Sequence, residues 1–195
     1  MRRSGIMVAI AGLLTAFPTV SIGQSEPALF DEDGYRTARY RSPISIDPTP
    51  APHLSLSASL ALDPHTDALF IDVMPVEGGV RDPVTGRWTL SQDHLTIPGA
   101  LWYPETGRSP VDTHLWRALE QKVRQARSKG PYYPIIVFCR ADCWMSWNAA
   151  KRLAESGIDN VWWLAEGTDG WNAAGRDLVV AEPVAVPASR TERGE

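Results

Sequence analysis

Short runs of consecutive apolar residues are the first pattern along the chain. Ala68–Val73 is apolar except for Asp72 near its end, and Pro134–Cys139 contains no polar residue. Runs of this length are typical of strands that are buried on both faces of a parallel sheet. Asn160–Leu164 has the same character, and Thr96–Trp102 predicts a turn that leads into a short strand.

Between these runs, apolar residues recur at helical spacing. Val111–Lys129 predicts a helix, because three apolar residues four positions apart define one face: Leu115, Leu119 and Val123. A second helix is predicted over Cys143–Ser156, and a glycine-rich turn at 166–171 opens a short last one. Alternating strands and helices predict an α/β fold, an open parallel sheet of about five strands with helices on both faces.

The two ends of the chain differ from this alternating part. Residues 1–23 begin with two arginines, continue as an apolar stretch and end in small residues, which is the pattern of a secretory signal peptide. Residues 24–53 are rich in proline and predict an extended arm with a short edge strand around Ala38–Ile46. The folded domain is expected over residues 54–181, followed by a C-terminal tail, residues 182–195.

Composition and charge narrow the function classes. Hydrophobic residues make up 44% and charged residues 22% of the chain, as in ordinary globular proteins. The formal net charge of −4 gives no basic surface for phosphates, so we expect no nucleic-acid partner. After cleavage of the signal peptide no segment is long enough to span a membrane, which predicts a soluble protein of the periplasm.

Export to an oxidising compartment changes which roles are expected for the two cysteines. Cys139 and Cys143 are the only cysteines, and in an oxidising compartment such a pair is either a structural disulfide or a redox or catalytic pair. Two thiols alone do not complete a four-ligand zinc site, and the histidines lie far upstream in the sequence. We therefore expect neither a resident metal nor another cofactor.

The position of Cys139 favours a redox or catalytic role over a purely structural one. It follows the most apolar of the predicted strands and precedes a tight loop and a helix, and this is where open α/β sheets place ligands. Free N–H groups at the helix start would stabilise a thiolate there and lower its pKa. Arg140 would act in the same direction, whereas Asp142 would oppose it.

Taken together, these segments resemble a rhodanese domain. The resemblance covers roughly residues 54–175 and rests on a series of short motifs: Phe70-Ile71-Asp72-Val73, Ile97-Pro98-Gly99-Ala100, Val137-Phe138-Cys139 and Ala149-Ala150 through Gly157. It implies that Cys139 is a nucleophile that carries a persulfide in a loop of backbone N–H groups. It also implies that the substrate is bound by the residues of that loop: Arg140, Ala141, Asp142, Trp144 and Met145.

A narrower resemblance concerns residues 142–150. Asp142-Cys143-Trp144 and the residues after it are similar to the CXXCW-motif proteins associated with PQQ-dependent catabolism, although three residues rather than two separate the cysteines here. Gly34-Tyr35-Arg36 and Gly167–Trp171 are similar to that family too. This resemblance implies an exported accessory protein of PQQ-dependent alcohol catabolism, whose partner is a periplasmic PQQ-dependent dehydrogenase or its cytochrome.

Three functions stay open at this point. The first is thiol chemistry, either sulfur transfer or thiol–disulfide exchange, at Cys139 with Cys143 as its partner. The second is a non-catalytic binding or assembly module that uses a tryptophan-lined face around Trp144 and Trp147, with the cysteines as a structural disulfide. The third is a carrier of Cu(I) or a small molecule on the two thiolates.

Overall fold

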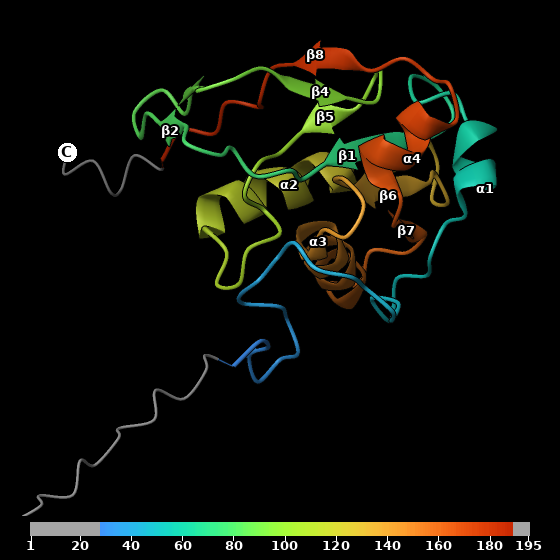
Figure 1. Ribbon diagram of the computed structural model, residues 1–195, viewed down its shortest axis with the longest axis horizontal. Helices are drawn as coiled ribbons and strands as arrows, with labels where there is room; N and C mark the ends of the chain where they lie inside the picture. Colours follow the sequence, from blue (N-terminus) through green and yellow to red (C-terminus); the bar gives the residue numbers. More distant parts are fainter. Residues whose placement is uncertain (1–27, 189–195) are drawn as a thin grey trace, which may run out of the picture.

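A four-stranded parallel sheet forms the centre of the molecule (Figure 1). The computed structural model describes residues 28–188. The strand order is β5-β1-β6-β7 and every neighbouring pair is parallel. The strands are β1 (Leu69–Asp72), β5 (Leu101–Trp102), β6 (Ile135–Phe138) and β7 (Val161–Leu164). All four coincide with strands expected from the sequence, and the α/β fold class is confirmed.

Helices cover both faces of this sheet (Figure 1). On one face, α2 (Thr113–Ala126) and α3 (Trp144–Glu155) pack against strand side chains such as Val137. On the other, α1 (Leu56–Leu60) and α4 (Gly167–Ala173) pack with Phe138. Alternate residues of a strand point to opposite faces, so a strand that is apolar throughout supplies both cores.

The connections contain two small antiparallel pairs. The connection after β1 holds β2 (Val80–Arg81) paired with β3 (Trp88–Thr89). β4 (His94–Thr96) pairs with β8 (Val179–Ala181), which the sequence did not indicate. The helix expected to continue to Lys129 ends earlier, because residues 127–129 form the 3₁₀ helix η1 (Arg127–Lys129).

The arm contains no strand over Ala38–Ile46, so this expectation from the sequence is wrong and the sheet has four strands rather than about five. The segment follows α3 instead and is held by side chains of that helix. The indole Nε1 of Trp147 donates to the carbonyl of Ile46 at 2.9 Å. The amide of Asn148 both donates to and accepts from the backbone of Arg36, at 2.8 and 2.9 Å. These side-chain hydrogen bonds replace the backbone pairing that an edge strand would need.

Both edges of the central sheet are covered by segments at or beyond the ends of the predicted domain. On one edge, the N–H of Trp163 in β7 donates to Pro52, and the N–H of Leu54 donates back to Trp163. On the other, the N–H of Val184 donates to Trp102 in β5. The chain continues packed as far as Ala188, so residues 182–188 lie along the domain rather than apart from it.

The expected signal peptide, residues 1–23, lies outside the described residues, as do 24–27 of the arm and 189–195 of the tail. Among residues 28–188, no helix has the length and apolar character needed to cross a membrane.

Candidate functional site

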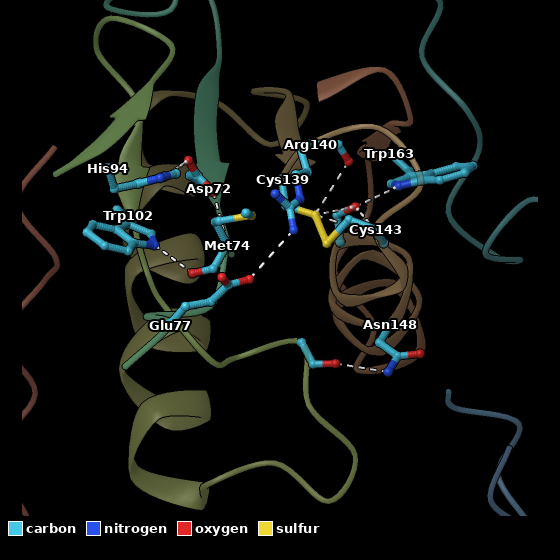
Figure 2. Close-up of a disulfide and its surroundings, with 12 residues drawn as sticks. Asp72, Met74, Glu77, His94, Trp102, Cys139, Arg140, Cys143, Asn148 and Trp163 are labelled. Atoms are coloured by element: carbon cyan, nitrogen blue, oxygen red, sulfur yellow. Dashed lines mark hydrogen bonds and ion pairs between the residues drawn. A yellow bond between two sulfur atoms is a disulfide. The ribbon is translucent and has the colours of Figure 1, made fainter. Parts of the chain in front are cut away.

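A disulfide joins Cys139, the residue directly after β6, to Cys143, the N-cap residue of α3 (Figure 2). The two Cα atoms are 6.4 Å apart. The bond therefore closes the loop between the central strand and the helix that the sequence analysis singled out. Both sulfurs lie at the start of α3, where N–H groups point out of the helix.

The arm covers this loop from one side. The N–H of Trp144, the first residue of α3, donates to the carbonyl of Tyr40 at 2.8 Å, and the N–H of Ser42 donates to the carbonyl of Asp142 at 3.0 Å. Arg41 and Cys143 thus form an isolated antiparallel bridge. The N–H of Trp144 is therefore paired with the arm instead of facing the sulfur, as was predicted for the N–H groups at this helix start.

The start of α4 holds the loop from the other side. The carbonyl of Cys139 accepts from the N–H of Thr168 at 2.9 Å, and Arg140 forms a bridge with Gly167. Gly167 has a φ of +51°, and a Cβ there would lie 2.3 Å from the Cys139 carbonyl oxygen. Only glycine allows the two backbones to approach this closely.

The two sulfurs have different neighbours. Cys139 is 1% exposed, and its Sγ lies 3.6 Å from the hydroxyl of Ser146, on the first turn of α3. That hydroxyl donates to the carbonyl of Cys143 and accepts from the indole N–H of Trp163, both at 3.0 Å. Cys143 is 6% exposed and lines a cavity.

This cavity has a volume of about 220 Å³ and carries positive charge. Its lining comes from the arm, the loop after β1, the segment before α2 and the disulfide loop: Tyr40, Arg41, Met74, Pro75, Glu77, Arg108, Arg140, Cys143 and Met145. Glu77 is 3.6 Å from the guanidinium of Arg140 (Figure 2), and Arg108 pairs with Glu105 at 2.6 Å. Arg41 is exposed, and no carboxylate of residues 28–188 pairs with it.

The sequence-predicted site residues separate into two groups. Arg140, Cys143 and Met145 meet at the cavity. Ala141 and Asp142 form the loop backbone, with Asp142 exposed and at a φ of +55°.

Trp144 faces the arm instead of the cavity. Its ring lies 5.3 Å from that of Phe30, and the guanidinium of Arg36 is 4.8 Å from its centre. Trp144 and Trp147 are 5% and 4% exposed, so the face that the binding hypothesis requires is covered by residues of the arm. Packing, rather than an open aromatic surface, accounts for these tryptophans.

Arg41, Arg108 and Ser146 were not identified from the sequence. Arg41 and Arg108 reach the cavity from segments far from the cysteines in the chain. Ser146 lies within the predicted helix, but only the fold shows which way it faces.

A second polar cluster supports the cavity wall. Asp72, at the end of β1, is fully buried and accepts hydrogen bonds from His94 Nε2 at 2.7 Å, Thr96 Oγ1 at 2.6 Å and the N–H of Met74 at 2.8 Å (Figure 2). The indole N–H of Trp102 also donates a hydrogen bond to the carbonyl of Met74 at 2.7 Å. Asp72 therefore fixes the turn that carries Met74 into the cavity.

The described residues contain no group of three or more His, Cys, Asp or Glu side chains that could hold a metal ion. The two sulfurs are bonded to each other, so neither is a thiolate in this structure. A Cu(I) site on the pair requires reduction first.

Comparison with protein families matches residues 59–174 to the rhodanese-like domain. That span includes the central sheet, the disulfide loop and α4. The chain belongs to the rhodanese-like domain family. Residues 28–58 and 175–188 lie outside the matched range, and both pack on the matched domain.

Among solved structures, the chain is similar to a thiosulfate sulfurtransferase from Pseudomonas aeruginosa, with a TM-score of 0.45 and 21% identity over 73% of this chain and 22% of that one. It is also similar to a Helicobacter pylori protein solved by NMR, with a TM-score of 0.40 and 16% identity over 66% of this chain and 89% of that one. The chain thus spans about a fifth of the length of the Pseudomonas enzyme. A comparison with curated proteins finds no significant match.

Proposed function

We propose that this rhodanese-like protein carries out thiol–disulfide exchange with the Cys139–Cys143 pair, as an exported accessory protein of PQQ-dependent alcohol catabolism. The observation that carries the proposal is the disulfide itself, which lies at the start of α3 with one of its cysteines, Cys143, lining a basic cavity. An external thiol would reach the disulfide through this cavity, and the helix start would stabilise the thiolate released when the bond opens.

Exchange is favoured over sulfur transfer by what occupies the loop. A persulfide on Cys139 needs space and free amides around the terminal sulfur. Here Cys139 is 1% exposed and bonded to Cys143, and the Trp144 N–H is paired with the arm. Thiol–disulfide exchange, in which the bond between the two cysteines opens and re-forms, fits this arrangement better than sulfur transfer.

The chemistry is tested with purified protein. We expect small thiols to open the disulfide without unfolding the protein, so that two thiols become alkylatable while the circular dichroism spectrum is unchanged. Reduced protein should transfer little sulfur from thiosulfate to cyanide. A disulfide that opens only on unfolding would refute the proposed chemistry.

The biological part concerns export and the PQQ-dependent system. Residues 1–23 have the pattern of a signal peptide, and the family resemblance of residues 142–150 supports a periplasmic dehydrogenase or its cytochrome as partner. In the source organism, cells that carry Cys139→Ser or Cys143→Ser should grow more slowly on an alcohol oxidised by that system, with normal growth on other carbon sources.

The alternative is a non-catalytic binding module in which the disulfide is structural. The contact between the arm and α3 favours this alternative, because the arm holds the disulfide loop in place as a structural disulfide would. Under this alternative, either serine variant would retain normal growth on the alcohol provided that it folds. The same growth experiment therefore separates the two functions.

A further inference from the structure

The two sulfurs of the disulfide are not equally accessible. Cys143 lines the cavity beside the loop, whereas Cys139 is not among the residues that line it and is 1% exposed. In Figure 2 the disulfide lies near Arg140, which extends toward Glu77. Of the two cysteines, Cys143 is therefore the one that a molecule in the cavity contacts.

We propose that this cavity binds a small anionic thiol, which attacks Cys143 and releases Cys139. The inference rests on the proposed exchange function and names its substrate class and the order of the two cysteines. It reverses the roles that the rhodanese resemblance implies, since Cys139, the residue in the nucleophile position, becomes the leaving group.

The charge of the cavity selects an anion. Arg41, Arg108 and Arg140 line it, against the single carboxylate of Glu77. Glu105, outside the lining, pairs with Arg108, so the surroundings keep a net positive charge. The chain as a whole has a formal net charge of −4, so the charge at the cavity is opposite in sign to that of the whole protein. Guanidinium groups bind carboxylates through paired hydrogen bonds, which the exposed Arg41 is able to offer.

The volume limits the ligand to a small molecule. Sites for drug-sized ligands occupy about 300–1,000 Å³, whereas this cavity has a volume of about 220 Å³. A thiol with one short chain and one carboxylate is within this size, whereas a fused-ring cofactor exceeds it.

Ser146 is placed to stabilise the departing sulfur. Its hydroxyl, 1% exposed, is 3.6 Å from Cys139 Sγ. Because the indole N–H of Trp163 already fills one acceptor position on this oxygen, the hydroxyl proton is free to turn from the Cys143 carbonyl toward a thiolate at Cys139. Ser146 is thus a positioning residue for the leaving group.

The reaction balances as two exchanges. The external thiolate attacks Cys143 Sγ, which forms a mixed disulfide there, and the original sulfur–sulfur bond breaks to leave Cys139 as a thiolate. A second external thiolate then attacks the sulfur of the first, which releases the external disulfide and Cys143 thiolate. The protein pair gains two electrons and the two external thiols lose them.

The first experiment measures how fast three thiols open the disulfide of the folded protein: 3-mercaptopropionate, 2-mercaptoethanol and cysteamine. Each rate is divided by the rate of the same thiol with 2-hydroxyethyl disulfide, which removes differences in intrinsic reactivity. We expect the anionic thiol to be favoured about tenfold over the neutral one. Combined Arg41→Gln and Arg140→Gln should abolish this preference, and Arg117→Gln, an exposed arginine on α2 away from the cavity, should retain it.

The outcomes separate the two proposals. A preference that survives the double substitution, or three equal rates, overturns the anionic substrate and leaves thiol–disulfide exchange intact. A disulfide that none of the thiols opens in the folded protein overturns the exchange function itself.

The order of the cysteines is tested by trapping the mixed disulfide. The reaction with 3-mercaptopropionate is quenched in acid, free thiols are alkylated, and trypsin, which cleaves after Arg140, separates the two cysteines into different peptides. Mercaptopropionate should be on the Cys143 peptide and the alkyl group on the Cys139 peptide. The opposite distribution overturns the assignment.

The role of Ser146 is tested in the Cys143→Ser background by the pH profile of Cys139 alkylation. Ser146→Ala should move the midpoint of this profile to higher pH, because the thiolate loses a donor. Ser156→Ala, at the opposite end of the same helix, is the matched control and should not move it. An unchanged midpoint in Ser146→Ala overturns the positioning role.

Discussion

The starts of α2 and α3 are built in different ways. At α2, the carboxylate of Asp112 accepts hydrogen bonds from the N–H groups of His114 and Leu115, at 2.8 and 3.2 Å. At α3, the N-cap residue Cys143 makes no such side-chain bond, and the first amide pairs with a carbonyl of the distant arm. At α2 the N-cap residue supplies the acceptors itself, whereas at α3 the arm supplies one and the N-cap position is held by a cysteine.

The largest effect should follow from removing the contact between α3 and the arm. Asn148 is fully buried and bonds to the N–H and carbonyl of Arg36 and to the carbonyl of Gly107. Asn148→Ala leaves these groups unpaired and should lower the free energy of unfolding by about 3 kcal/mol, measured by urea denaturation. The exposed Asn172→Ala should cost less than about 0.5 kcal/mol. Equal effects of the two substitutions would mean that the arm does not hold α3.

Reduction of the disulfide should have the next largest effect. Three residues lie between the two cysteines, so the bond closes a short loop. Opening it restores conformational freedom to the unfolded chain and should lower the free energy of unfolding by about 2 kcal/mol. The measurement compares urea denaturation with and without reductant. Cys143→Ala should have the stability of the reduced wild type both with and without reductant. If reductant also lowers the stability of this variant, the effect does not come from the disulfide.

The cap of α2 should contribute less and depend on pH. Burial alone would raise the pKa of Asp112, but the N–H groups of Leu115 and His114 and nearby Arg81 lower it below 3.8. Asp112→Ala should cost about 1 kcal/mol at pH 7. A depressed pKa stabilises the fold above 3.8, and this contribution is lost as the pH falls through the folded-state pKa.

Thermal denaturation of wild type and Asp112→Ala over pH 2 to about 7 follows this loss. The difference in melting temperature between the two proteins should become smaller as the pH falls through the acid range. A difference that widens below pH 3.8 would contradict the lowered pKa.

The ion pair beside that cap should contribute least. Arg81 Nη2 is 2.8 Å from Asp112 Oδ2, and the aspartate side chain is 39% exposed, so water and salt screen the attraction. Arg81→Gln should cost at most about 0.5 kcal/mol at low ionic strength and less in about 1 M salt. Urea denaturation at the two salt concentrations measures this, and an effect as large as that of Asp112→Ala would make the ion pair part of the cap.

The contrast between the two helices also explains what was predictable from the sequence. Leu115, Leu119 and Val123 are buried as their spacing predicts. The four strands were recognisable because each is a short apolar run or follows a turn signal. In these cases the signal lies within a few residues of the feature it specifies.

The parts that were missed depend on contacts between distant residues. β8 was not recognised because its pairing with β4 joins segments that lie far apart in the chain. The arm was expected to form an edge strand, but Trp147 and Asn148 bind its backbone through side chains. The position of Cys139 and Cys143 at the start of α3 was predictable, whereas the arginines of the cavity were not, since no local pattern brings Arg41 and Arg108 to that loop.

The segments that cover the two sheet edges have a practical consequence for expression. A truncated protein comprising only residues 59–174 would lack both Pro52–Leu54 and Val184. The outer backbone groups of β5 and β7 would then be open to strand addition by other molecules, a common route to aggregation. Soluble preparations for crystallography or biochemistry should therefore begin before the arm and extend at least to Ala188.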